Sequence, residues 1–122
     1  MTARLAAIVL GIVFVVVGLL GFVNDPVLGL FDVDPLHNIV HLVSGLVLLA
    51  GAYSSLGSGM ALKIIGVVYA IVAILGFFGG EGTFFGIMAN NDADKWLHVV
   101  LAVVILAAAF GLSDDEGKAQ AM

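Results

Sequence analysis

All three histidines of this chain stand at helical spacing from each other or from an acidic residue. His37 and His41 are four residues apart, and so are Asp94 and His98, so each pair projects from one face of a helix over one turn. If the two helices turn these faces toward each other, three imidazoles and one carboxylate converge. Imidazoles and carboxylates bind Zn²⁺, Fe²⁺, Mn²⁺ or Cu²⁺ in proteins. The spacing therefore indicates a candidate metal site of His37, His41, Asp94 and His98.

Polar neighbours of these four residues supply a second layer that can orient them. Asp34, Asn38 and Asn91 lie within four residues of a candidate ligand and carry carboxylate or amide side chains. A haem is the related alternative, because His41 and His98 can be two axial ligands of one iron between the helices. The spacing does not choose between haem b and a single divalent ion.

The same residues also have a structural interpretation in which nothing is bound. Asp34 and Asn91 are typical helix caps, because their side chains accept hydrogen bonds from the first turn. A histidine near such a cap can bond a loop carboxylate such as Asp32 or Asp92, and Asp94 can close a capping box with Asn91. The cluster then pins the outer loops to the bundle. The sequence favours this interpretation over a metal, a haem or a proton-handling site.

The chain around these residues is too apolar for a water-soluble domain. Of its 122 residues 62% are hydrophobic and 11% charged, whereas soluble domains use about a quarter of their residues as charges. The formal charge of −5, with only four Lys and Arg, excludes a surface for nucleic acid. Because cysteine is absent, metal chemistry is limited to His, Asp, Glu or Met.

Four apolar segments are long enough to cross a membrane, since a span needs about 20 residues at about 1.5 Å each. They run over about residues 5–23, 36–53, 61–78 and 96–112. None has the polar and apolar alternation of a barrel strand. The sequence therefore predicts an all-α fold, a four-helix transmembrane bundle in a single integral membrane domain (1–122) with a short polar tail at 113–122.

The second half of the chain repeats the first. A shift of 55 residues aligns the first apolar segment with the third, and a shift of 57 places His41 on His98 and His37 on Asp94. The two units cover about residues 5–54 and 61–112. Two spans return the chain to its starting side, so the units have the same orientation. They form two parallel helix-loop-helix repeats about a pseudo-twofold axis along the membrane normal.

The distribution of basic residues predicts the orientation. Arg4, Lys63 and Lys118 share the side of the termini, and Lys95 lies on the side of the two long loops. Because Lys and Arg prefer the cytoplasm, both termini are expected there. We expect a multi-pass protein of the cell's inner (cytoplasmic) membrane. Its expected partners are the lipid bilayer and a homo-oligomer or larger membrane complex, with no nucleic acid.

Two helix starts carry a resemblance to a known family. They read Asp34-Pro-Leu-His-Asn-Ile-Val-His-Leu42 and Asn91-Asp-Ala-Asp-Lys-Trp-Leu-His98. They resemble the N-P-L-H-N-x-x-H-L and N-x-A-D-x-W-L-H-L motifs of small four-helix bacterial membrane proteins, common in actinobacteria, that form a domain of unknown function. The resemblance covers essentially the whole chain. It implies the same fold, no particular activity, and signature positions at His37, Asn38, His41, Asp94, Trp96 and His98. Asp34 departs from the family's usual Asn and adds a charge near the histidines.

Little in the sequence points to catalysis. Ser44 lies among apolar residues in mid-helix, and no glycine-rich loop follows a strand. We therefore expect a non-enzymatic structural or accessory membrane protein with a His/Asp cluster near its outer face. The alternative is a transition-metal-binding or haem-binding membrane protein that uses His37, His41, Asp94 and His98. A further alternative is proton or ion transfer, because histidine titrates near neutral pH.

Overall fold

Four long helices dominate the computed structural model, which describes residues 1–113. They are α1 (Ala3–Leu20), α2 (Pro35–Tyr53), α3 (Ser58–Gly76) and α4 (Asp92–Gly111). Each is long and apolar enough to span a membrane, with a mean hydropathy between 1.5 and 2.7 over 18 residues. The predicted all-α, four-helix membrane fold is confirmed. The tail expected at 113–122, with Lys118, lies outside the described residues except for Ser113.

Three helix ends differ from the predicted ranges by three or four residues. α3 begins at Ser58 rather than 61. α4 begins at Asp92 rather than 96, because Asn91 caps a polar first turn that a search for apolar residues leaves out. α1 ends at Leu20 rather than 23, where the N–H of Gly21 bonds the carbonyl of Val17 and closes the helix.

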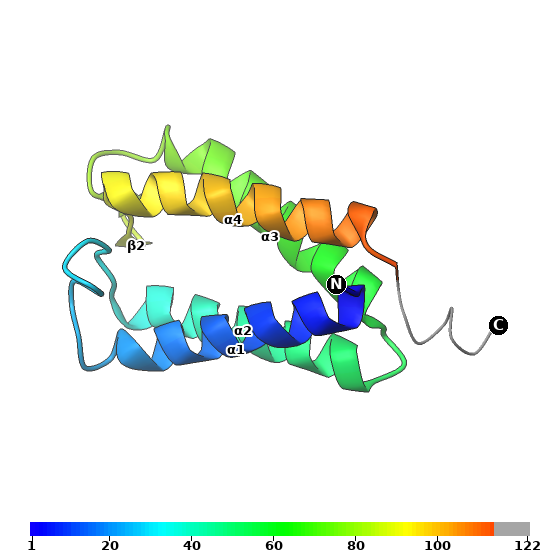
Figure 1. Ribbon diagram of the computed structural model, residues 1–122. Helices are drawn as coiled ribbons and strands as arrows, with labels where there is room; N and C mark the ends of the chain where they lie inside the picture. Colours follow the sequence, from blue (N-terminus) through cyan, green and yellow to red (C-terminus); the bar gives the residue numbers. More distant parts are fainter. Residues whose placement is uncertain (114–122) are drawn as a thin grey trace, which may run out of the picture.

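The helices pack mainly as two pairs, α1 with α2 and α3 with α4 (Figure 1). In each pair a glycine lies where the two helices approach each other closely. A Cβ added to Gly11 would lie 2.9 Å from Cγ of Leu49, and one added to Gly66 would lie 2.6 Å from Cδ2 of Leu106. Gly11 and Gly66 are equivalent in the repeat, and so are the two leucines. The two halves therefore pack their helices in the same way.

The two long loops, 21–34 and 77–91, contain matching antiparallel pairings. In the first loop Val27 pairs with Phe31 in an isolated bridge. In the second, β1 (Thr83–Phe84) pairs with β2 (Met88–Ala89), so that Phe84 faces Met88. The small two-stranded piece is an addition to the predicted fold.

Both pairings close through residues with a left-handed backbone. Leu28 and Gly29 have φ of 54° and 72°, and Phe85 and Gly86 have φ of 52° and 74°. Glycine adopts this conformation readily, whereas a bulky residue such as Leu or Phe rarely does. The same unusual turn in both halves shows that the repeat extends into the loops.

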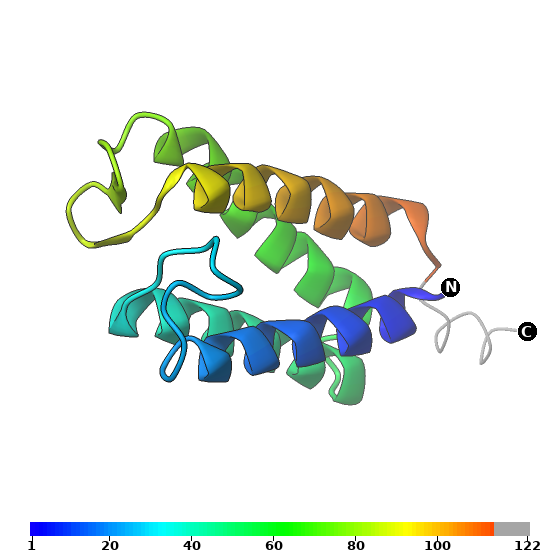
Figure 2. The ribbon, with the colours of Figure 1, turned by 60° about the vertical axis from the view of Figure 1, so that its left-hand side comes forward.

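Both long loops lie at one end of the bundle, here called the long-loop end, and the start of α1 and the end of α4 lie at the other (Figures 1 and 2). At that other end the N–H of Ala3 donates to the carbonyl of Ser113 at 2.9 Å. Nε of Arg4 donates to the carbonyl of Ala52 at 3.1 Å, and its guanidinium lies 4.8 Å from the centre of the Tyr53 ring. The first contact joins the start of α1 to the residues that follow α4, and the two contacts of Arg4 join α1 to the end of α2.

Candidate metal centre

The starts of α2 and α4 at the long-loop end are held by side-chain caps, as the sequence predicts. Oδ1 of Asp34 accepts the N–H of His37 at 2.9 Å. Oδ1 of Asn91 accepts the N–H of Asp94 at 2.8 Å, and Oδ2 of Asp94 accepts the N–H of Asn91 at 3.0 Å. The second pair of bonds is a capping box. The caps therefore define where both helices begin, and this determines the positions of the residues in their first turns.

Each cap also bonds the loop of the other half. Oδ2 of Asp34 accepts the N–H of Ala89 at 2.7 Å, and Nδ2 of Asn91 donates to the carbonyl of Leu30 at 2.9 Å. Asp34 and Asn91 are equivalent positions in the repeat, so the exchange is reciprocal. The two helix starts are therefore tied to each other through the loops, and this tie does not involve a histidine side chain.

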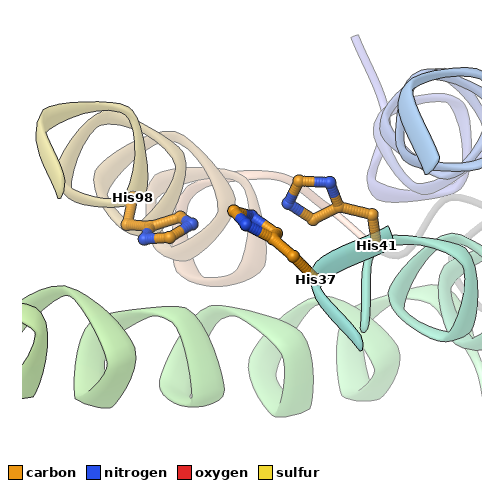
Figure 3. A group of neighbouring side chains, drawn as sticks. All are labelled: His37, His41 and His98. Carbon is orange, nitrogen blue, oxygen red and sulfur yellow. The ribbon is translucent and has the colours of Figure 1, made fainter. Parts of the chain in front are cut away.

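Three buried imidazoles meet between these helix starts (Figure 3). His37 and His41 come from α2 and His98 from α4, and their exposed fractions are 1%, 4% and 2%. One ring nitrogen of each lies within 4.8 Å of the corresponding nitrogen of the other two. His41 and His98 are six residues, or about 9 Å, from the starts of their helices, and His37 is two residues, or about 3 Å, from the start of α2. We call these three residues the histidine cluster.

Most of the nitrogens in the histidine cluster have no hydrogen-bond partner. This holds for both nitrogens of His37, both of His41 and Nδ1 of His98. The backbone of Ala89 lies beside His37 but without the geometry of a hydrogen bond. These nitrogens therefore make none of the bonds to loop carboxylates that the structural interpretation expected. An unpaired buried polar group costs about 1–3 kcal/mol, so a cluster of them points to a ligand.

Asp94 does not join the cluster. Within residues 1–113 the group of mutually close metal-binding atoms consists of the three histidines. The carboxylate of Asp94 is buried and folds back to the N–H of Asn91, because the third position of a helix is where an acidic side chain reaches the cap. Of the four candidate ligands that the sequence predicts, the structure brings the three histidines together and leaves Asp94 apart from them.

The chain matches the family described as Domain of unknown function (DUF4383) over residues 4–111. The chain belongs to this family. No curated protein and no solved structure matches it. The match takes in nearly all of the four helices and the histidine cluster, and it confirms the family resemblance found in the sequence. With its four apolar helices, this DUF4383 member is a multi-pass membrane protein.

A haem between His41 and His98 does not fit this DUF4383 chain. The ring of His37 lies between the other two rings (Figure 3). Its centroid is 4.5 Å from that of His41 and 5.7 Å from that of His98, so it touches both. A porphyrin held by two axial ligands needs that space for its macrocycle. The geometry thus favours a single ion over haem.

An aromatic layer lies against the histidine cluster. The ring of Phe14 is 5.8 Å from that of His41, the ring of Tyr69 is 5.9 Å from that of His98, and the two aromatic rings are 5.1 Å apart. Oη of Tyr69 lies 3.0 Å from Oγ of Ser44. Sequence reasoning missed this layer. The signal was present, because Phe14 and Tyr69 are equivalent in the repeat and only one of them carries a hydroxyl.

Asn38 was expected to orient the histidines but lies against α1. It is buried, and a Cβ added to Gly21 would overlap its Oδ1. Its backbone carbonyl is also 3.0 Å from a Cβ added to Gly18. The side chain therefore fills the space beside Gly21, and Gly18 allows the backbone of α2 to approach α1 closely. Trp96 is 63% exposed and packs on Phe77 with ring centroids 5.3 Å apart.

Proposed function

We propose that this protein is a metal-binding membrane protein in which His37, His41 and His98 hold one transition-metal ion. The observation that carries the proposal is the burial of three imidazoles together, with five of their six nitrogens lacking a hydrogen-bond partner. A metal bonded to one nitrogen of each ring supplies a partner for one nitrogen of every imidazole, and it explains why polar rings lie in an apolar bundle.

The distances are within reach of a metal site. Bonds of about 2.0–2.1 Å at tetrahedral angles place two ligand nitrogens about 3.4 Å apart. The ligand nitrogens of the histidine cluster lie within 4.8 Å of one another, so the widest pair closes by at most about 1.4 Å. Small rotations of the side chains supply such a movement without a change in the helices.

The structural interpretation does not account for the histidines equally well. The hydrogen bonds that tie the loops together come from Asp34 and Asn91, with a backbone group as the partner in each case. The ties remain if the imidazoles are replaced by apolar groups. The stability of the loops therefore does not explain why three unpaired imidazoles lie at this place.

The kind of ion follows from the ligands. Three neutral imidazoles suit zinc, copper or iron better than manganese, which prefers oxygen ligands. The carboxylates of Asp34 and Asp94 are engaged by backbone N–H groups, so they do not bring an anion into the ligand set. Copper is favoured, because its monovalent form brings one charge fewer into an apolar site.

The proposed role is binding rather than catalysis. Oγ of Ser44 donates to the carbonyl of Val40 at 2.7 Å and lies 3.0 Å from Oη of Tyr69. It is therefore not paired with an imidazole that could act as its base.

We place the protein in the cytoplasmic membrane, with both termini inside and the long-loop end outside. Arg4 and Lys63 support this orientation, since basic residues prefer the cytoplasmic side. The ammonium of Lys63 lies 5.3 Å from the centre of the Phe110 ring, near the end of α4 that lies away from the long loops. The exposed apolar faces of the helices contact the lipid bilayer or further copies of the chain.

Elemental analysis tests the proposal. The untagged protein is purified in mild detergent without chelator, and its metals are counted per chain. We expect about one zinc, copper or iron, and its loss in each of His37→Leu, His41→Leu and His98→Leu. Trp96→Phe is the control, because this exposed residue lies on α4 two positions before His98. Metal that remains in all three histidine variants, or a wild-type protein that neither contains nor takes up metal, would refute the proposal.

A further inference from the structure

An apolar cavity of about 210 Å³ lies between α1, the first long loop and α4. Its wall consists of side chains from these elements, together with one imidazole from α2. The wall includes Phe14, Val17, Phe31, His41, Leu97 and Leu101. His41 presents ring carbons to the cavity, because both of its nitrogens are inaccessible. The wall therefore contacts an occupant through carbon atoms and suits a hydrocarbon.

The cavity results from a difference between the two repeats. The repeat makes the contact of α1 with α4 equivalent to that of α3 with α2, yet α3 and α2 pack together far more extensively. Between α3 and α2, Oη of Tyr69 lies 3.0 Å from Oγ of Ser44. The equivalent residues between α1 and α4 are Phe14 and Leu101, which line the cavity. Since neither has a hydroxyl group, no such hydrogen bond draws α1 toward α4.

The cavity is open toward the interior of the membrane. Val13 lines it, is 48% exposed, and lies ten residues, or about 15 Å, from the start of α1. The first long loop covers the end of the cavity that is nearest to the outside of the bundle. This loop is held against the start of α4 by the bond from Nδ2 of Asn91 to the carbonyl of Leu30 (Figure 2). An occupant therefore enters sideways, from the lipid.

The volume of the cavity fits part of an acyl chain. A dry apolar cavity of about 150 Å³ binds benzene, which is about 25 Å³ for each carbon atom. At the same scale, 210 Å³ holds about eight carbon atoms. An empty cavity lowers stability, and the acyl chains of the bilayer are the hydrocarbon present at its mouth.

The charges of the first long loop distinguish between lipid headgroups. Residues 21–34 contain three aspartates and no Lys, Arg or His. Asp25 and Asp32 are exposed in this loop, on either side of the residues that cover the cavity. Carboxylates repel an anionic headgroup and attract an ammonium group. A lipid whose chain lies in the cavity therefore binds best with an ammonium-bearing headgroup.

We propose that this cavity binds one acyl chain of a phospholipid whose headgroup carries an ammonium group. The chain passes between α1 and α4, and the headgroup lies beside the first long loop. No nitrogen of the histidine cluster takes part. Lipid binding is therefore expected with or without a metal, and this inference does not rest on the proposed function.

The test uses phospholipids with brominated acyl chains, which quench tryptophan fluorescence at near contact. The reporter is Phe14→Trp in a chain whose single tryptophan is removed by Trp96→Phe. Phe14 is 3% exposed, so lipid on the surface of the bundle does not reach it. In nanodiscs of brominated lipid we expect the reporter to lose most of the fluorescence that it has in ordinary lipid. An unquenched reporter would overturn the proposal.

Filling the cavity should remove the quenching. Val17→Phe and Leu101→Phe, each added to the reporter chain, enlarge side chains of the wall. Val16→Phe and Val100→Phe are matched controls on the same two helices, because these residues are 55% and 56% exposed. The controls should leave the quenching unchanged. Quenching that persists in both cavity variants would show that lipid reaches the reporter without the cavity, and would contradict the proposal.

The headgroup is tested with two nanodisc mixtures of the same composition. Both contain equal parts of phosphatidylethanolamine and phosphatidylglycerol, and the bromine is on the chains of one lipid or of the other. We expect stronger quenching when the ethanolamine lipid carries the bromine. The difference should shrink in a variant with both Asp25→Asn and Asp32→Asn, and persist in Glu81→Gln in the second long loop. Equal quenching in the two mixtures would refute the selection of an ammonium headgroup.

Discussion

Replacing His98 by Leu tests whether this histidine binds a metal or stabilises the fold through hydrogen bonds. Leu is apolar and close in size, so it removes a ring nitrogen without a partner and leaves little space behind. If the histidine cluster binds metal, the metal-free variant should be as stable as the metal-free wild type, within about 1 kcal/mol. A histidine that held the fold through hydrogen bonds would instead lose several times that amount.

Added metal should stabilise the wild type far more than the His98→Leu variant. At a free metal concentration of about 100 times Kd, binding to the folded wild type stabilises it by about 2.7 kcal/mol. Removing one of three ligands should raise Kd at least about a hundredfold. The same concentration of free metal is then no higher than the Kd of His98→Leu. Metal therefore stabilises this variant by at most about 0.4 kcal/mol.

Thermal unfolding in detergent, with and without added metal, measures both effects. The wild type and Trp96→Phe should show a clear rise in Tm with metal, and His98→Leu should show almost none. Two results would refute the reasoning. One is a metal-free His98→Leu protein that is about 2 kcal/mol or more less stable than the wild type, and the other is a variant that metal still stabilises fully.

Three further substitutions test the surroundings of the site. Asp94→Ala should lower stability by about 1 kcal/mol through loss of the capping box, while the metal content per chain stays unchanged; loss of metal would show that the carboxylate is a ligand after all. Asp34→Ala removes the bonds to His37 N and Ala89 N and should lower stability by about 1–3 kcal/mol in denaturant unfolding, whereas an effect near zero would mean that the cross-loop tie is weak. Gly21→Ala should lower Tm, because the new methyl overlaps Asn38 and overpacking costs about 1–3 kcal/mol; an unchanged Tm would show that the asparagine moves aside freely.

Sequence reasoning reached the fold because the signals are local. Four long apolar runs predict four spans, and Asp34 and Asn91 mark the starts of two helices that the structure caps with those side chains. The repeat predicted that the histidines converge, since it places His41 and His98 at equivalent depths in α2 and α4.

Other features of the site depend on side-chain conformations, which the spacing of residues in the sequence does not determine. Helical spacing treats Asp94 and His98 as neighbours on one face, but a side chain at the third helical position can also turn back to its cap, and it does so here. The position of His37 between the other two rings, which leaves no room for haem, requires coordinates.

The long loops were the hardest part to predict. Their turns place Leu28 and Phe85 at positive φ, a conformation for which a bulky side chain gives no signal. The cross-loop bonds to Leu30 and Ala89 depend on how these loops fold, so they were out of reach as well.

X-ray absorption at the metal edge, recorded on the untagged protein loaded with copper or zinc, tests the central claim most directly. We predict a first shell dominated by nitrogen at about 2.0–2.1 Å, with the outer-shell scattering of about three imidazole rings. A first shell of oxygen without imidazole scattering, or a protein that takes up no metal, would contradict a metal site made of His37, His41 and His98.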